Sequence, residues 1–221
     1  MPVLYIGNKN YSSWSMRPWL ALKWAGLPFE ERVLELGMLG YGKSKQANIL
    51  AVSPSGRVPA LRLDSGETMW DSLAISEWAH EQAPGAALWP ADPVARAMAR
   101  TASAEMHSGF AALRRDASMN IRRRAAPREW AEDVRMDLAR LEELWGDLRA
   151  RFGAGGPFLF GKRTIADAMF APVATRIRTY AISVSPVAQA YCDAIFADDA
   201  FRAWEAAAEK ETWTQPNVDA A

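Results

Sequence analysis

The chain of 221 residues has one cysteine, Cys192, and only two histidines. A single cysteine excludes an internal disulfide framework, so the sequence favours a reducing compartment and predicts a cytoplasmic protein. Cys192 itself is interpreted as a small buried hydrophobic residue. The histidines, His80 and His107, lie far apart without ligand spacing and do not indicate a metal site.

Net charge and long apolar runs are also absent. Lys+Arg and Asp+Glu both number 26, so no overall field attracts nucleic acid or an anionic membrane. No stretch approaches the roughly 18 unbroken apolar residues of a membrane span, and the first residues lack the features of a signal peptide. The basic runs Arg114–Arg115 and Arg122–Arg124 have no interleaved aromatic residues. They are interpreted as solvated turns, with a carboxylate-bearing substrate or an intersubunit ion pair as alternatives.

Hydrophobic residues, at 50% of the chain, are sufficient for a sizeable core. Their periodicity in residues 1–82 alternates between that of strands and that of helices. The predicted order is a strand at 3–6, a helix ending at Gly26, a strand at 31–36, a short helix within 43–50, a hairpin at 60–63 and 68–70, and a helix at 72–82.

Three prolines and a glycine in residues 83–93 indicate a linker, and the pattern beyond them is helical. We therefore predict an α/β domain at 1–82, a linker at 83–92 and an all-helical domain at 93–221. Helices are predicted at 94–119, at 127–151, after the capping box of Thr164 and Asp167, and as two or three segments within 187–210.

Two short motifs indicate a site for a small zwitterionic peptide. Val58-Pro59 stands at the start of a strand, where an X-Pro bond can be cis at modest cost. A cis bond would direct the backbone groups of Val58 towards an extended peptide. Asp71-Ser72 opens a helix, which brings a carboxylate, a hydroxyl and helix N-terminal N–H groups to one spot.

The loop that enters the first helix is rich in hydroxyls, with Ser12, Ser13 and Ser15. At a helix N-terminus, a hydroxyl that donates to a thiolate lowers the pKa of the thiol from about 8.5 towards neutrality. Helix capping without any catalytic role is the alternative interpretation of these serines.

Together these motifs resemble those of the cytosolic glutathione transferases, over nearly the whole chain. The pattern is that of a serine-type bacterial member related to the zeta class. It comprises Ser-x-x-x-x-Arg at Ser12 and Arg17, the Val58-Pro59 and Asp71-Ser72 motifs, and the capping box at residues 164–167. The resemblance implies a thioredoxin-like N-terminal domain (βαβ, ββα) followed by a C-terminal helical bundle, and a homodimer.

The resemblance also implies roles for single residues in binding glutathione as the co-substrate. Ser12 would be the catalytic residue, which stabilises the glutathione thiolate. The γ-glutamyl group would lie at Asp71 and Ser72, and the cysteinyl backbone would pair with Val58. Arg57 is a further candidate contact. Lys43 and Lys45 are candidates for the glycyl carboxylate, with a solvated face as the alternative.

Candidates for the site of the second substrate are Tyr11, Met106, His107 and Phe110. His107 lies on the helix that usually lines this pocket in the family, and Met106 and Phe110 are one turn apart. For His107 the alternative is a role in helix packing or in an interface.

The sequence departs from the zeta pattern, which has Ser-Ser-Cys followed by Arg-Val-Arg. Here Trp14 replaces the cysteine, and Pro18-Trp19 follows Arg17. The departure disfavours an isomerase of the maleylacetoacetate type, and the absence of a cysteine in this loop disfavours disulfide exchange. The prediction is a detoxifying enzyme that conjugates glutathione to an electrophilic small molecule. A non-catalytic binding or scaffold protein is the other alternative.

Overall fold

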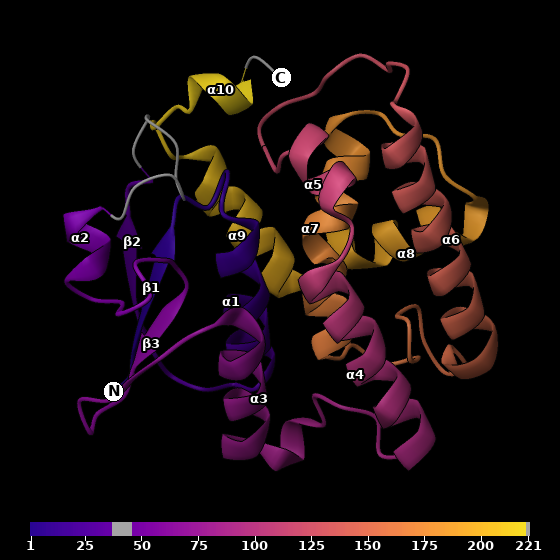
Figure 1. Cartoon of the computed structure of the whole chain (residues 1–221). Coiled ribbons are helices and arrows are strands. Elements are labelled where there is room, and N and C mark those ends of the chain that lie inside the picture. Colours follow the sequence, from indigo (N-terminus) through magenta and orange to yellow (C-terminus); the bar gives the residue numbers. More distant parts are fainter. Residues whose placement is uncertain (37–45, 220–221) are drawn as a thin grey trace.

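The computed structural model describes residues 1–36 and 46–219, in which one half is built on a sheet and the other is helical (Figure 1). The first half confirms the predicted thioredoxin-like fold. Its elements are β1 (Val3–Gly7), α1 (Ser13–Trp24), β2 (Glu30–Leu34), α2 (Ala47–Leu50), β3 (Ala60–Arg62), β4 (Thr68–Met69) and α3 (Ser72–Gln82).

The sheet has the strand order β2-β1-β3-β4, with every residue of β1 buried. Val3 of β1 lies opposite Glu30 in the parallel strand β2, and Leu4 lies opposite Leu61 in the antiparallel strand β3. Parallel neighbours need a crossover connection, which α1 provides. Helices α1 and α3 pack against each other, and the N-terminus of each lies beside the pocket described below.

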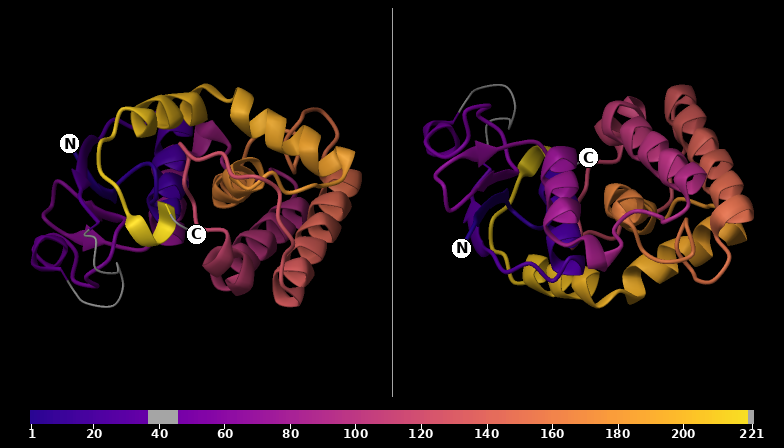
Figure 2. Two further views of the ribbon diagram at one scale, coloured as in Figure 1. Left: turned by 90° about the horizontal axis from the view of Figure 1, so that it is seen from above. Right: turned by 90° about the horizontal axis from the view of Figure 1, so that it is seen from below.

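The second half confirms the predicted all-helical fold. It contains the 3-10 turn Pro84–Ala86 and α4 (Pro93–Ser108), α5 (Ala111–Asp116), α6 (Glu132–Phe152), α7 (Ile165–Thr179), α8 (Pro186–Ala197), α9 (Asp199–Glu209) and α10 (Pro216–Asp219). Figure 2 shows α7 enclosed by the other helices, and every residue of α7 except Arg178 is buried. Because α7 and α9 also pack on α1, the two halves share one hydrophobic core.

Some predicted helix bounds were wrong. The helix predicted at 94–119 is divided into α4 and α5, because Gly109 is extended and Phe110 has a φ of 55°. The helix predicted from residue 127 begins at Glu132, since the preceding segment is tied to α7 by a hydrogen bond from Ala125 N to Thr179 O (2.7 Å). The short helix α10 was not predicted, and the domain boundaries at 83–92 stay a prediction. No helix in the described ranges is both long and apolar enough to cross a membrane.

Candidate functional site

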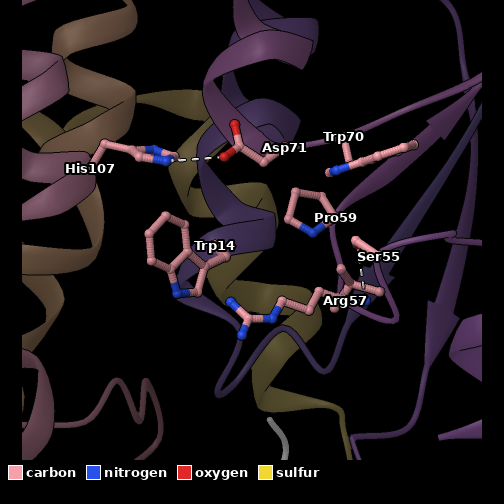
Figure 3. Close-up of a pocket in the computed structure, with 8 residues that line it drawn as sticks. Trp14, Ser55, Arg57, Pro59, Trp70, Asp71 and His107 are labelled. Carbon is pink, nitrogen blue, oxygen red and sulfur yellow. Dashed lines mark hydrogen bonds and ion pairs between the residues drawn. The ribbon is translucent and has the colours of Figure 1, made fainter. Parts of the chain in front are cut away.

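A pocket of about 630 Å³ lies where the two halves meet (Figure 3). Its walls come from the start of α1, the turn before β3, the N-terminus of α3 and the end of α4. The residues that line it are Trp14, Ser55, Arg57, Val58, Pro59, Trp70, Asp71 and His107. Residues of the two sequence motifs, at 53–61 and 71–72, therefore meet at one pocket, and their role in binding a peptide stays a prediction.

The turn before β3 forms one wall of the pocket. The Val58-Pro59 bond is cis, as the sequence led us to expect, and so is the Trp70-Asp71 bond. Val58 is buried, whereas Arg57 is exposed and its guanidinium points towards Trp14 in Figure 3. A cationic group thus lies opposite an indole across the pocket.

The N-terminus of α3 forms a second wall. Asp71 caps this helix, because its Oδ1 accepts hydrogen bonds from Leu73 N (3.0 Å) and Ala74 N (3.5 Å). Ser72, the first residue of the helix, is fully buried, and its hydroxyl has no hydrogen-bond partner in the part of the chain that the structure describes. A buried donor without a partner is costly, so a ligand oxygen at Ser72 would gain a strong contact.

His107 connects the helical half to this wall. Its Nε2 lies 3.0 Å from Asp71 Oδ2, and its ring contacts Trp14 edge to face, with centroids 5.2 Å apart. One oxygen of Asp71 thus caps α3 while the other holds His107 (Figure 3). The sequence singled out both residues but did not predict that they would pair.

The predicted catalytic residue, Ser12, is not among the residues that line the pocket, although Trp14, two residues further along the chain, is. Ser12 is 5% exposed, and its hydroxyl donates to Ser15 Oγ at 2.7 Å. Ser15 Oγ in turn accepts a hydrogen bond from Gly7 N (3.1 Å) at the end of β1. The two hydroxyls therefore form a chain anchored on the sheet.

The loop that carries Ser12 is buried and held by residues to which the sequence analysis gave no such role; Arg122 among them was interpreted as part of a solvated turn. Glu211 accepts hydrogen bonds from Lys9 N (2.6 Å) and Asn10 N (3.0 Å). The Asn10 side chain donates to Asn120 Oδ1 (2.9 Å) and accepts from Arg122 N (2.9 Å). These partners are more than a hundred residues away along the chain, so no local pattern could have revealed them.

Of the four candidates for the second-substrate site, only His107 lines the pocket. Met106 and Phe110 are buried in the core, and Tyr11 is buried with its hydroxyl donating to Asp219 (2.9 Å). Burial and the hydrogen bond to Asp219 raise the pKa of Tyr11. The second-substrate roles of these residues stay predictions.

Two further predictions concern the glycyl carboxylate and metal ions. Lys43 and Lys45 lie outside the described residues. Within residues 1–36 and 46–219, no three His, Cys, Asp or Glu side chains come together as a metal ion would require.

Comparisons with known proteins identify relatives along most of the chain. Residues 11–82 match the family model of the glutathione S-transferase N-terminal domain. Maleylacetoacetate isomerase of Pseudomonas aeruginosa is 35% identical over 156 residues, which is 68% of this chain and 72% of that protein. Maleylacetoacetate isomerase of Rattus norvegicus is 28% identical over 84% of this chain and 82% of its own.

Solved structures agree with these relatives. A glutathione transferase homologue from Burkholderia, with bound glutathione, has a TM-score of 0.72 and 27% identity, covering 95% of this chain and 99% of its own. A glutathione transferase from Methylococcus capsulatus has a TM-score of 0.70 and 26% identity over the same shares of the two chains, 95% and 99%.

Proposed function

Because this chain belongs to the cytosolic glutathione S-transferase family and is related to its zeta class, we propose that it conjugates glutathione, bound in this pocket, to an electrophilic small molecule. It is an enzyme of the glutathione S-transferase type. The observation that supports the proposal most directly is the pocket itself, in which the two predicted peptide-binding motifs meet.

In the proposed complex, the γ-glutamyl carboxylate lies at the N-terminus of α3. There it accepts hydrogen bonds from the hydroxyl and N–H of Ser72, where the helix dipole also favours an anion. The γ-glutamyl ammonium lies near Asp71 Oδ2, which His107 contacts in the described structure. The backbone of Val58 pairs with the cysteinyl residue, and Arg57 supplies positive charge at the rim.

The proposed catalytic step is stabilisation of the thiolate by Ser12. Its hydroxyl turns from Ser15 to the sulfur and donates to the anion, while the thiol proton leaves to solvent. Ser15 can then donate its own hydroxyl hydrogen to Ser12 Oγ and still accept from Gly7 N, so the chain of hydroxyls strengthens the donor. The electron pair of the sulfur forms a C–S bond to the electrophilic carbon. In a displacement the leaving group departs with the electron pair of the bond that breaks, and in an addition to a double bond the resulting anion takes a proton from water. The protein contributes positioning and anion stabilisation.

The test of this proposal compares Ser12→Ala with Ser13→Ala. In the wild-type protein, the pKa of the thiol of bound glutathione should lie about one to three units below that of free glutathione. Each unit requires about 1.4 kcal/mol of preferential stabilisation of the thiolate. Ser12→Ala should return the pKa towards its free value and slow turnover at neutral pH with little change in affinity. Ultraviolet absorbance of the thiolate against pH measures the effect.

Ser13→Ala is the matched control, since only Ser12 has the family's five-residue offset from Arg17. If Ser13→Ala has the larger effect, the catalytic serine is misassigned by one residue. If neither variant changes the pKa, the loop serines only cap α1 and the proposed mechanism is wrong.

The names of the relatives favour a second candidate function, glutathione-dependent isomerisation of the maleylacetoacetate type. Trp14 occupies the position of the zeta-class cysteine and packs on His107 in the pocket wall. An isomerase assay beside a panel of electrophiles separates the two reactions. A glutathione-binding protein without catalysis would bind glutathione but show no turnover in either assay.

A further inference from the structure

Two arginines are buried in the core without an acidic partner among the residues that the structure describes. Arg17 of α1 is 0% exposed, and none of its three guanidinium nitrogens has a hydrogen-bond partner in the described residues. Arg176 of α7 is 3% exposed, and its Nε donates to Ala117 O (2.8 Å), while Nη1 has no partner there. Neither forms an ion pair with a described carboxylate.

Arg114 of α5 brings a third guanidinium to the same place. The Cζ atoms of Arg17 and Arg114 lie 4.3 Å and 5.1 Å from the ring centroid of Trp14. Arg114 is half-buried, and its Nη1 donates to the carbonyls of Met106 (3.3 Å) and His107 (3.1 Å). Trp14 itself lines the pocket, so Arg17 and Arg114 lie directly behind its wall, and Arg176 reaches the carbonyl of Ala117 at the end of α5, the helix that carries Arg114.

The three positive charges act on one another. Burial and the charges of Arg176 and Arg114 hold the pKa of Arg17 well below its usual range. Burial and the charge of Arg114 lower the pKa of Arg176 to about 10. The negative charges of Asp71 and Asp137 raise the pKa values of Arg17 and Arg114 respectively, against the effect of burial. One oxygen of Asp71 already pairs with His107, and one oxygen of Asp137 accepts a hydrogen bond from Leu113 N (2.9 Å).

Such a cluster is costly unless an anion neutralises it. A guanidinium stays protonated in proteins, and an uncompensated buried charge is strongly destabilising. The planar fork of N–H donors matches the two oxygens of a carboxylate. The guanidinium donors without partners, the repulsion between charges of the same sign and the burial of these side chains therefore all indicate a carboxylate ligand.

We infer that Arg17, Arg114 and Arg176 form a binding site for a small oxyanion of the carboxylate class, behind Trp14. The site is separate from the proposed glutathione contacts at Val58 and Ser72 and does not depend on the proposed function. The half-buried edge at Arg114 provides access. The ligand is either a free small carboxylate or the carboxylate group of a larger molecule that reaches past Trp14.

Thermal unfolding without glutathione tests this inference. Formate replaces a bulky sulfonate at constant ionic strength, so that screening is unchanged. The wild-type midpoint should rise saturably, by about 5–10 °C when formate reaches about a hundred times its dissociation constant. Arg17→Met should abolish the response and should itself unfold at a higher temperature than wild type in sulfonate, because it removes a buried unpaired charge.

Two further variants make the test independent of how Arg17→Met folds. Arg114→Gln, at the half-buried edge, should weaken the formate response at least tenfold. Arg128→Met is the matched control: the Arg128 guanidinium also stacks on an indole at 4.3 Å, over Trp130, but is exposed. It should keep the wild-type response.

Benzoate in place of formate distinguishes the two sources of the carboxylate. A response to formate alone indicates a free small anion, and a response to both indicates a group carried by a larger molecule. A midpoint that does not respond to either anion, or that responds equally in wild type and Arg114→Gln, overturns the inference and leaves ordered water as the partner of these donors.

Discussion

The buried hydroxyl of Ser72 is expected to contribute to ligand binding and not to the stability of the fold. Its Oγ makes no hydrogen bond within the described chain, so Ser72→Ala should leave the stability of the free protein nearly unchanged. In the proposed complex the same hydroxyl contacts a carboxylate, so the variant should weaken glutathione binding by about 1–3 kcal/mol. Saturable quenching of tryptophan fluorescence by glutathione measures the affinity.

Ser76→Ala is the matched control for this prediction. Ser76 is also buried, one turn further along α3, but its hydroxyl donates to the carbonyl of Ser72 (2.7 Å). This variant should lose stability while its affinity for glutathione stays close to wild type. An unchanged affinity in Ser72→Ala would place the γ-glutamyl group elsewhere.

At the residue scale, burial was easier to predict than pairing. Cys192 is buried as expected, and burial raises the pKa of its thiol to about 12, so it stays protonated at neutral pH. By contrast, the contacts of Ser12 with Ser15 and of Asp71 with His107 depend on side-chain directions that only the folded backbone defines. Sequence motifs supplied the candidates, and the fold determined their partners.

Among the elements, α7 has the most informative N-terminus. The predicted capping box is present: Asp167 Oδ2 accepts from Thr164 N (2.7 Å) and Thr164 Oγ1 (3.0 Å), and Oδ1 accepts from Leu159 N (3.2 Å). Burial raises the pKa of Asp167 to about 6, although these hydrogen bonds oppose the shift. Removal from water therefore outweighs the hydrogen bonds to the ionised form.

The raised pKa gives a prediction with a definite sign. Asp167 has an unfolded pKa near 3.9, so between about pH 4 and 6 the native state binds more protons, and the contribution of this carboxyl to stability falls as pH rises. Asp167→Asn lacks this dependence. The difference in free energy of unfolding between wild type and variant should shrink by about 2 kcal/mol from pH 4 to pH 7, measured by urea denaturation. A difference that grows with pH would contradict it.

The bounds of helices were predicted correctly where the sequence carries a strong capping or helix-breaking residue, and were missed where that signal is weak. The helix at 72–82 was predicted with the bounds that the structure has, because Asp71 supplies a strong N-cap. The break between α4 and α5 was missed, since one glycine in an alanine-rich pattern is a weak signal. There, a side chain at Gly109 would place its Cβ 2.8 Å from Glu105 O, a clash that only the structure reveals.

For the whole molecule, the predicted order of an α/β half and a helical half is confirmed, whereas their junction could not be read from the sequence. Trp204 Nε1 donates to Lys9 O (3.0 Å), and Glu211 accepts hydrogen bonds from the backbone N–H groups of Lys9 and Asn10 in the same loop. These contacts join the two ends of the chain. Hydrophobic periodicity shows which face of a helix is buried but not which distant segment covers it.

Assembly is the last prediction. The family resemblance implies a twofold dimer in which the α/β domain of one subunit lies against the helical domain of the other. Sedimentation at micromolar concentration should therefore give a species of about twice the 24.4 kDa chain. Val94, near the junction of the halves at the start of α4, is 58% exposed and apolar. A buried charge at an interface is costly, so Val94→Asp should weaken the dimer at least tenfold.

Val187→Asp on α8 is the matched control, since Val187 is an apolar residue of similar exposure, 49%, that belongs to a different helix. It should leave the dimer intact. Equal weakening by both variants would show that the effect is not specific to the start of α4. A single 24.4 kDa species for wild type would remove the dimer, and a pocket completed within one chain would then have to account for all glutathione binding.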